Sequence, residues 1–248
     1  MDFSRFLSFN TPLGKLIRLP LRAIPKDATV RVLRGPLRGA HWTVGSSTHG
    51  CWLGTYERAF QSFFFSIVPE GGVVLDVGAN VGFYSLLAAR KAAKVIAFEP
   101  LPENLSYLRR HIELNRLKEC IQVIPSAASD HDGTGLFSLV PGNRSEGSLS
   151  SHGTLPVRTV RLDSLGTVPD VIKIDVEGNE HEVLRGAIKT MRTYHPLVLV
   201  ARHSGDSYCQ DLLKELGYQV SEIAHGELLA RKPAGPTSNK LPGESLSA

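Results

Sequence analysis

From about residue 70 onward, short apolar runs alternate with segments in which apolar residues recur every three or four positions. A short, nearly continuous apolar run is typical of a strand buried on both faces, and the longer period is typical of a helix that covers a sheet. The predicted strands are 73–77, 95–98, 121–124, 171–176 and 197–200, and the predicted helices are 81–90, 102–115, 180–191 and 206–216. Alternating strands and helices predict an α/β fold with a mostly parallel sheet and helices on both faces.

Two features interrupt or extend this pattern. Residues 133–139 and 155–162 are predicted strands on either side of a loop, 141–153, that is rich in Gly, Ser and Asn. The loop is either a mobile lid over a substrate or a plain surface loop. Residues 218–224 and 227–230 are predicted to form a hairpin, which brings the main sheet to seven strands.

The residues before the alternation form a region of their own. Residues 30–44 are predicted to form a hairpin, and residues 55–68 carry aromatic side chains at helical spacing. We therefore expect an N-terminal extension over 1–69 that packs on the core and contributes to substrate contacts. The main domain is expected over 70–231, and the Pro-, Gly- and Ser-rich tail, 232–248, is expected to be disordered.

Composition narrows the classes of protein that fit. The 248 residues carry a net charge of +4 and no basic tract, so we expect no nucleic-acid partner. The three cysteines are far apart, which favours a reducing compartment and a cytoplasmic protein. No apolar stretch approaches the roughly 20 residues that cross a bilayer, so no transmembrane segment is expected. The first 20 residues are expected to dock as a helix or, alternatively, to make a weak peripheral membrane contact. The oligomeric state stays open.

A glycine turn follows the first strand of the alternation and carries the clearest chemistry. Its sequence is Asp-Val-Gly-Ala-Asn-Val-Gly, from Asp76 to Gly82, and Gly78 and Gly82 allow tight turning and close approach of a ligand. Asp76 ends a buried strand, so its carboxylate needs a ligand ammonium or backbone N–H groups as partners. Glu99 ends the second strand, 21 residues after Gly78, where an acidic residue can accept hydrogen bonds from a ribose. These residues favour a nucleoside-containing cofactor over the alternative of a tight turn and a helix-capping Glu.

The glycine spacing argues against a dinucleotide. NAD-binding turns follow Gly-x-Gly-x-x-Gly, which this chain lacks, and a pyrophosphate disfavours a nearby carboxylate such as that of Asp76. S-adenosylmethionine carries an ammonium and a sulfonium group, so an acidic residue beside the turn suits it better. The sequence therefore favours methyl transfer over hydride transfer.

Three segments together resemble the FkbM-type methyltransferases. They are Asp76–Ser85, Phe98–Pro100 and Lys173–Glu180, the last followed by Val183–Gly186. The Lys-Ile-Asp-Val-Glu-Gly-Asn-Glu segment is the most specific part, and the resemblance covers about residues 52–200. It implies a class I methyltransferase fold, which is Rossmann-like, with S-adenosylmethionine as the methyl donor.

The resemblance also implies roles for individual residues. The glycine turn would hold the methionine part of the cofactor through Asp76, Gly78, Asn80 and Gly82. Glu99 would hold the ribose, and residues 126–130 would frame the adenine. Asp130 would accept a hydrogen bond from the adenine amino group or, alternatively, only form a turn. The implied acceptor is a hydroxyl oxygen of a sugar or of another small natural product.

Candidate catalytic residues follow the fourth and fifth predicted strands. Asp175 and Glu177 lie on the same face of the fourth strand, where one carboxyl could act as base; alternatively, they cap the next helix together with Glu180. After the fifth strand, the family pattern predicts a Glu, a hydrophobic residue and a His, whereas this chain has Ala201, Arg and His203. His203 is a candidate base or a structural histidine. A divalent cation held by Asp175, Glu177 and His203 is the less favoured hypothesis, and no metal is expected.

Three other classes of protein remain as alternatives. One is a non-catalytic binding or scaffold protein with the same fold, which would explain why Ala201 stands where the family pattern has a Glu. An NAD-dependent oxidoreductase would need the dinucleotide turn. A nucleic-acid methyltransferase would show a basic face or an Asn/Asp-Pro-Pro-Tyr/Phe motif, neither of which is present in the sequence.

Overall fold

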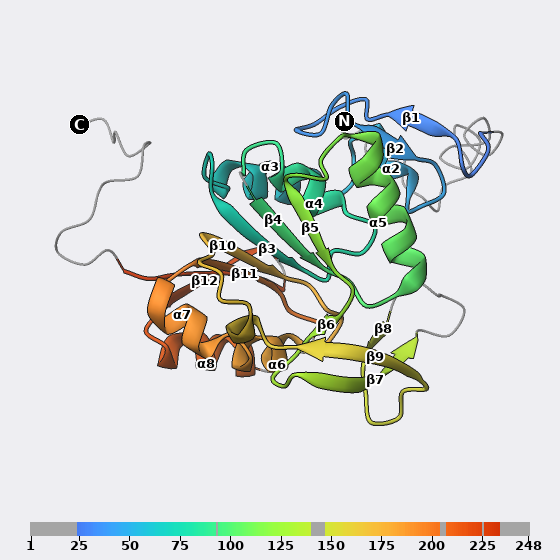
Figure 1. Ribbon diagram of the computed structural model, residues 1–248. Coiled ribbons are helices and arrows are strands. Elements are labelled where there is room, and N and C mark those ends of the chain that lie inside the picture. Colours follow the sequence, from blue (N-terminus) through green and yellow to red (C-terminus); the bar gives the residue numbers. More distant parts are fainter. Residues whose placement is uncertain (1–23, 93, 140–146, 204–206, 225, 234–248) are drawn as a thin grey trace, which may run out of the picture. The chain divides into compact units, whose positions relative to one another are not determined.

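The computed structural model describes residues 24–92, 94–139, 147–203, 207–224 and 226–233 (Figure 1). The chain divides into two compact units. The N-terminal unit consists of Met1–Gly72 and Ala79–Pro125, and the C-terminal unit consists of Val73–Gly78 and Ser126–Ala248. Residues 1–23 of the predicted extension and residues 234–248 of the predicted tail lie outside the described residues. The predicted boundaries at residues 69 and 231 therefore remain predictions.

The main sheet has seven strands in the order β12-β13-β11-β10-β3-β4-β5. They are β3 (Val73–Val77), β4 (Lys94–Phe98), β5 (Ile121–Ile124), β10 (Val171–Ile174), β11 (Leu197–Ala201), β12 (Gln219–Ala224) and β13 (Glu227–Arg231). β10 runs parallel to β3 and β11, and β4 runs parallel to β5, whereas β13 is antiparallel to β11 and β12. The predicted α/β class, the mostly parallel seven-stranded sheet and the terminal hairpin are therefore confirmed. Because the chain continues from β3 to β4 but returns on the other side as β10, the topological switch point lies beside β3.

Within its described residues, the N-terminal unit contains β4 and β5, a small hairpin and four helices. The hairpin pairs β1 (Thr29–Arg31) with β2 (His41–Thr43), and the helices are α2 (His49–Leu53), α3 (Arg58–Ile67), α4 (Phe83–Ala88) and α5 (Pro102–Leu114). The predicted hairpin and the predicted aromatic helix are thus confirmed. Phe60 and Phe64 of α3 both meet the ring of Tyr84 in α4 edge-on, so the aromatic positions of α3 serve core packing.

Among its described residues, the C-terminal unit adds three α-helices to β3 and β10–β13. They are α6 (Glu180–Arg185), α7 (Ile188–Tyr194) and α8 (Tyr208–Glu215), and Figure 1 shows them along one face of these strands. The prediction of one helix over 180–191 is wrong, because the helix breaks at Gly186. A Cβ on Gly186 would lie 1.9 Å from the carbonyl oxygen of Ser129, and the carboxylate of Asp163 accepts the N–H groups that begin α7.

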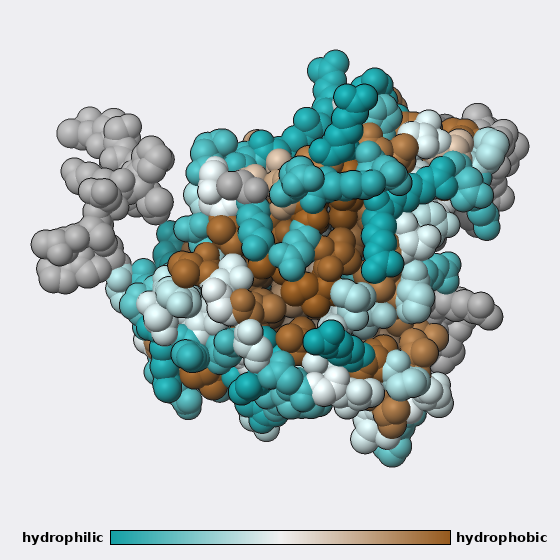
Figure 2. Space-filling view, in the orientation of Figure 1, coloured by the Kyte–Doolittle hydropathy of each residue, from teal (hydrophilic) through white to brown (hydrophobic). Residues whose placement is uncertain are grey.

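A second, four-stranded sheet in the C-terminal unit has the order β6-β9-β7-β8. Its strands are β6 (Ala127–Ala128), β7 (Gly133–Leu139), β8 (Gly147–Leu149) and β9 (Leu155–Val160). The prediction that the whole loop 141–153 lacks regular structure is wrong, since β8 pairs antiparallel with β7; residues 141–146 lie outside the described residues. Leu136 and Leu139 of β7 are 44% and 39% exposed, and Figure 2 shows apolar side chains on the surface around this sheet.

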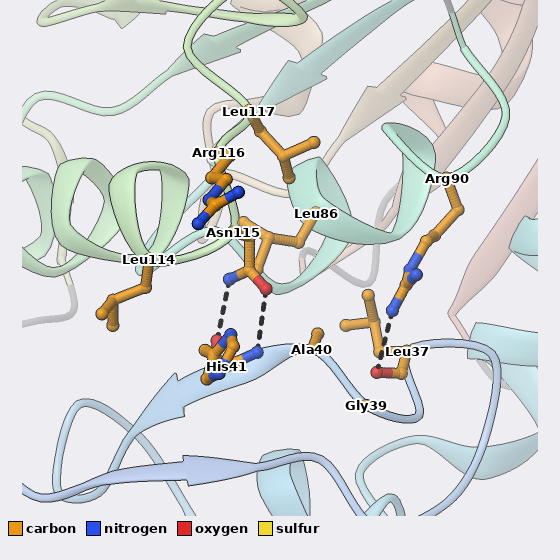
Figure 3. Close-up of a pocket in the computed structure, with 10 residues that line it drawn as sticks. All are labelled: Leu37, Gly39, Ala40, His41, Leu86, Arg90, Leu114, Asn115, Arg116 and Leu117. Atoms are coloured by element: carbon orange, nitrogen blue, oxygen red, sulfur yellow. Dashed lines mark hydrogen bonds between the residues drawn. The ribbon is translucent and has the colours of Figure 1, made fainter.

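Side chains at the end of α5 hold the backbone of β2. Asn115 accepts the backbone N–H of His41 and donates to its carbonyl oxygen, both over 2.8 Å (Figure 3). One turn earlier, Nε2 of His111 accepts the N–H of Thr43 over 3.0 Å, and Nδ1 lies 2.8 Å from the carbonyl oxygen of Val81. Asn115 and His111 thus bond backbone groups of β2 in the way that a neighbouring strand would. His111 also connects the hairpin to Val81 in the glycine turn.

Among the described residues, no helix combines the length and the apolar character needed to span a membrane.

Candidate active site

The glycine turn after β3 lies directly against the end of β10. Gly78 has a φ of 80°, and a Cβ at this position would lie 1.8 Å from the carbonyl oxygen of Asp175. The N–H of Asp175 in turn donates to the carbonyl oxygen of Val77 over 3.0 Å. Only glycine fits this position, since both the left-handed backbone and the contact exclude a side chain. The turn therefore stands next to the residues that follow β10.

A buried ion pair joins β3 and β10 where their residues are in register. Lys173 is paired with Asp76 across the two strands, and its Nζ lies 3.6 Å from Asp76 Oδ1 and 3.2 Å from Asp175 Oδ2. The side chains of Asp76 and Lys173 are 0% and 4% exposed. Sequence reasoning expected a ligand or loop N–H groups as partners of Asp76 and missed Lys173. The signal was a lysine within an otherwise apolar strand, because a lysine buried there needs an acidic partner.

The three predicted catalytic residues come together in one cluster. Nε2 of His203 lies 3.7 Å from Asp175 Oδ1 and 3.5 Å from Glu177 Oε2. Nδ1 of His203 lies 2.9 Å from an oxygen of Glu180, whose side chain is 1% exposed. The hydrogen bond to Glu180, with the nearby charges of Glu177 and Asp175, raises the pKa of His203 to about 9 against the opposing effect of burial. His203 is therefore a cation at neutral pH in the protein alone.

The positive charge of His203 affects the catalytic roles predicted for His203, Asp175 and Glu177. A protonated imidazole cannot accept a proton, so His203 does not meet the requirement for a base in the free protein. At the start of α6 the N-cap residue is Asn179 and no side-chain capping bond forms there. The alternative that the carboxylates complement the charge of this helix N-terminus together with Glu180 stays open. Glu177 adopts a φ of 58°, a left-handed conformation that costs about 1–3 kcal/mol, and residues with such backbone strain cluster at active sites. These features leave Asp175 and Glu177 as the candidate bases.

Glu99 holds the glycine turn in the N-terminal unit. Its buried carboxylate accepts the backbone N–H groups of Asn80 and Leu101, both over 2.9 Å, and the side-chain amide of Asn104 over 3.2 Å. Asn80 has a φ of 50°, and its side-chain oxygen accepts the N–H of Val81. Two predicted cofactor residues, Asn80 and Glu99, are thus in direct contact. Glu99 is more than a helix cap, because it fixes the backbone of the turn.

Gly82 is the second glycine of the turn and begins α4. It has a φ of 95°, and a Cβ there would lie 2.5 Å from Leu108 Cδ1 in α5. The expected close approach at Gly82 is thus already made by the protein itself.

Asp130 lies after β6 and is held by the side chains of Arg185 and His131. Arg185 Nη2 lies 2.5 Å from Asp130 Oδ2, and His131 Nδ1 lies 3.0 Å from Asp130 Oδ1. The hydrogen bond from His131, followed by the charge of Arg185, lowers the pKa of Asp130. Nearby, the hydroxyl of Ser126 is buried without a hydrogen-bond partner among the described residues. Because buried polar groups are normally satisfied, Ser126 is a group that a ligand could satisfy.

These residues fit S-adenosylmethionine in three separate respects. The turn at Gly78 presents backbone without a side chain, Glu99 provides an acidic group after the second strand, and Ser126 offers an unsatisfied hydroxyl in the stretch expected to frame an adenine. Asp175, Glu177 and His203 also present one ligand-type atom each, all within 4.8 Å of one another, which is a spacing that a metal ion can bridge.

A pocket of about 330 Å³ in the N-terminal unit lies elsewhere, at the C-terminal ends of α4 and α5 (Figure 3). Two of its polar side chains bind the protein itself: Asn115 bonds the backbone of His41, and Arg90 donates to the carbonyl oxygen of Arg38 over 3.1 Å. The predicted site residues within the described ranges do not line it.

The strand order, the glycine turn after β3 and the acidic residue after β4 define a protein with the class I methyltransferase fold. The family model "Methyltransferase FkbM domain" matches residues 76–221. The chain belongs to this family, as its three motifs predict. Membership also confirms the predicted methyl donor, S-adenosylmethionine.

Known proteins of this kind are similar over part of their length. Hexuronic acid methyltransferase AglP of Haloferax volcanii is 31% identical over 144 residues, which cover 55% of this chain and 58% of AglP. Methyltransferase sdnD of Sordaria araneosa is 29% identical over 174 residues, which cover 53% of this chain and 67% of sdnD. The crystal structure of methyltransferase FkbM from Methylobacillus flagellatus aligns with a TM-score of 0.47 and 17% identity, over 74% of this chain and 55% of that one. The chain thus spans little more than half the length of AglP.

Proposed function

We propose that this protein transfers the methyl group of S-adenosylmethionine to a hydroxyl oxygen of a sugar or another small molecule. The observation that carries the proposal is the contact between Gly78 and the backbone of Asp175. It brings the glycine turn and the carboxylates after β10 to the same edge of the sheet, where ligands of open α/β folds bind. Similarity to a hexuronic acid methyltransferase supports a sugar as the acceptor.

When bound, S-adenosylmethionine supplies an electrophilic methyl group on a positively charged sulfur, which keeps the electron pair of the broken C–S bond. An acceptor hydroxyl is a weak nucleophile until its proton leaves, so the protein needs a base near the methyl group. Asp175 and Glu177 take this role. Lys173 holds Oδ2 of Asp175, which leaves Oδ1 on the side of His203 to receive the proton. His203, as a cation, orients both carboxylates.

Alignment of the two reactants supplies much of the rate in such a displacement. The protein contributes to alignment by fixing its turn: Glu99 holds the N–H of Asn80, and Gly78 is packed against Asp175. Acceptor contacts from the N-terminal extension and from residues 141–153 remain predictions, as do the cytoplasmic location and the absence of a nucleic-acid partner.

The test begins with calorimetric titration of the purified protein with S-adenosylhomocysteine and, separately, with NAD. We expect saturable binding of S-adenosylhomocysteine alone, and a dissociation constant at least tenfold higher in Glu99→Ala. Glu103→Ala, an exposed acidic residue in the first turn of α5, is the matched control and should bind like the wild type. NAD binding in place of S-adenosylhomocysteine binding would overturn the proposed cofactor.

The acceptor is then sought with methyl-labelled donor and a panel of hexuronic acids, neutral sugars and simple alcohols. Mass spectrometry and NMR of the product should place the label on oxygen. Transfer to nitrogen or carbon would exclude the proposed O-methylation. A protein that binds S-adenosylhomocysteine but methylates no compound of the panel, and none in a cell extract, would favour the non-catalytic alternative that Ala201 raised.

A further inference from the structure

The residues around the end of β10 carry more negative than positive charge. Four carboxylates and two cationic groups meet there: Asp76, Asp175, Glu177 and Glu180 with Lys173 and His203. Two of the carboxylates, those of Asp76 and Glu180, are 0% and 1% exposed. Buried carboxylates require compensating charge, and one buried lysine serves both Asp76 and Asp175. Among these six groups the carboxylates are in excess, and a divalent cation would replace the proton on His203 Nε2.

Three atoms of this cluster have the spacing of ligands around one ion. Asp175, Glu177 and His203 each offer one ligand-type atom, and these atoms all lie within 4.8 Å of one another. Ligand atoms that share an ion at bond lengths of about 2.1 Å lie about 3.0 Å apart when adjacent and about 4.2 Å apart when opposite. The distances from His203 Nε2 to the two carboxylates are 3.7 and 3.5 Å. Small side-chain rotations are enough to close them around an ion.

Two of these groups, His203 and Asp175, are each oriented by a further residue. Glu180 accepts from His203 Nδ1, so Nε2 faces Asp175 and Glu177; a carboxylate on the second ring nitrogen is the usual companion of a metal-binding histidine. Glu180 is itself fixed, because it accepts the N–H of Gly178 over 2.9 Å. Lys173 occupies Oδ2 of Asp175 and leaves Oδ1 facing Nε2.

We propose that Asp175, Glu177 and His203 bind one divalent cation of the Mg²⁺ or Mn²⁺ type, with Glu180 as the positioning residue. Two carboxylates and one imidazole without a thiolate suit such a hard cation. The site does not require the carboxylate that is missing at Ala201, because Glu180 already occupies the place beside the imidazole. One consequence rests on the proposed function: with the cation bound, Asp175 and Glu177 would be its ligands, and the cation would favour loss of the acceptor proton to water in place of transfer to Asp175.

The test measures the cation alone, without methyl donor or acceptor. Protein treated with EDTA and desalted is titrated with MnCl₂, and free Mn²⁺ is followed by electron paramagnetic resonance. The wild type should bind one Mn²⁺ per chain, and Mg²⁺ should compete. Glu177→Gln and His203→Gln should each weaken Mn²⁺ binding at least tenfold. Glu182→Gln, an acidic residue of α6 that pairs with His181 outside the cluster, should stay within twofold of the wild type.

The outcomes separate this proposal from the proposed function. Absence of stoichiometric Mn²⁺ binding to the wild type, or equal binding by the wild type and both cluster variants, would overturn the cation site. Glu177 is 46% exposed in its side chain, so Glu177→Gln is expected to fold, which circular dichroism checks. S-adenosylhomocysteine binding is measured in EDTA on the same preparations. Binding of S-adenosylhomocysteine without Mn²⁺ would overturn the cation site and leave the proposed function standing. Binding of Mn²⁺ without S-adenosylhomocysteine would overturn the proposed function and leave the cation site standing.

Discussion

His111 accepts the backbone N–H of Thr43 through Nε2 over 3.0 Å, and neither residue is exposed to solvent. Its other ring nitrogen, Nδ1, faces the carbonyl oxygen of Val81 over 2.8 Å. The two partners define the neutral ring, with the proton on Nδ1, because a carbonyl oxygen needs a donor and an N–H needs an acceptor. Protonation of Nε2 would place its N–H opposite the N–H of Thr43, so the hydrogen bond between them would be lost. Burial lowers the pKa of His111 to about 4, although the hydrogen bond to Val81 acts in the opposite direction.

This histidine predicts a loss of stability in acid. The pKa of His111 rises from about 4 in the folded chain to the ordinary histidine value of 6.5 in the unfolded chain, so the unfolded chain binds more protons between these values. The contribution is complete above about pH 6.5 and is lost as the pH falls through 4. We expect the free energy of unfolding to drop by about 3 kcal/mol from this group between pH 7 and pH 4.

Urea denaturation across this pH range measures the effect. In His111→Gln the pH dependence between 4 and 6.5 should become shallower. His152→Gln, at an exposed position, should keep the wild-type slope. Equal slopes in the wild type and His111→Gln would show that another group is responsible.

Gly78 and Gly71 provide a matched pair for the glycine turn. Both have a positive φ, of 80° and 71°, but a Cβ on Gly78 would lie 1.8 Å from a backbone oxygen, whereas a Cβ on Gly71 would meet nothing within 4 Å. Gly71→Ala should therefore cost only the backbone strain, about 1–2 kcal/mol. Gly78→Ala should cost more than about 3 kcal/mol or prevent folding, because β3 and β10 must separate to admit the methyl group. Chemical denaturation compares the two, and equal losses would contradict the contact at Gly78.

The strands were predictable from the sequence because each has a local signature. β3 and β10 are apolar over almost their whole length, and the structure buries every residue of Val171–Ile174. The break of the helix at Gly186 was not predictable, since it depends on the carbonyl oxygen of Ser129 and the carboxylate of Asp163, both distant in the sequence. Periodicity describes one helix at a time and contains no information about a backbone that approaches from another element.

Some residues of the candidate site were predictable from the sequence, and others were not. Asp175, Glu177 and His203 were identified from the ends of their strands, and the structure brings them together. The sequence indicates only a helix-capping role for Glu180 and no role for Lys173. Their contacts depend on strand register and on the rotation of α6, which single-sequence reasoning does not fix. A charged residue inside an apolar strand was the one available sign for Lys173.

Asp130 provides a test of the predicted adenine contact. Its carboxylate is paired with Arg185, and the two side chains are 31% and 52% exposed, so solvent weakens their interaction. A double-mutant cycle with Asp130→Asn and Arg185→Gln should give a coupling energy below about 1 kcal/mol in thermal or chemical denaturation. If Asp130 also binds adenine, Asp130→Asn should weaken S-adenosylhomocysteine binding while Arg185→Gln does not. Equal effects of both variants on ligand binding would reduce Asp130 to a surface ion pair.

The pair between Lys173 and Asp76 predicts a non-additive loss of stability. Both side chains are buried, so Lys173→Met leaves the carboxylate of Asp76 in the interior without its cation. Breaking a buried pair from one side typically costs about 3–5 kcal/mol, whereas removing both charges is much less harmful. The double variant, Lys173→Met with Asp76→Asn, should therefore be more stable than Lys173→Met alone. Chemical denaturation of the wild type, both single variants and the double variant decides this. Additive losses would mean that Lys173 acts on Asp175 alone and that Asp76 finds its compensation elsewhere.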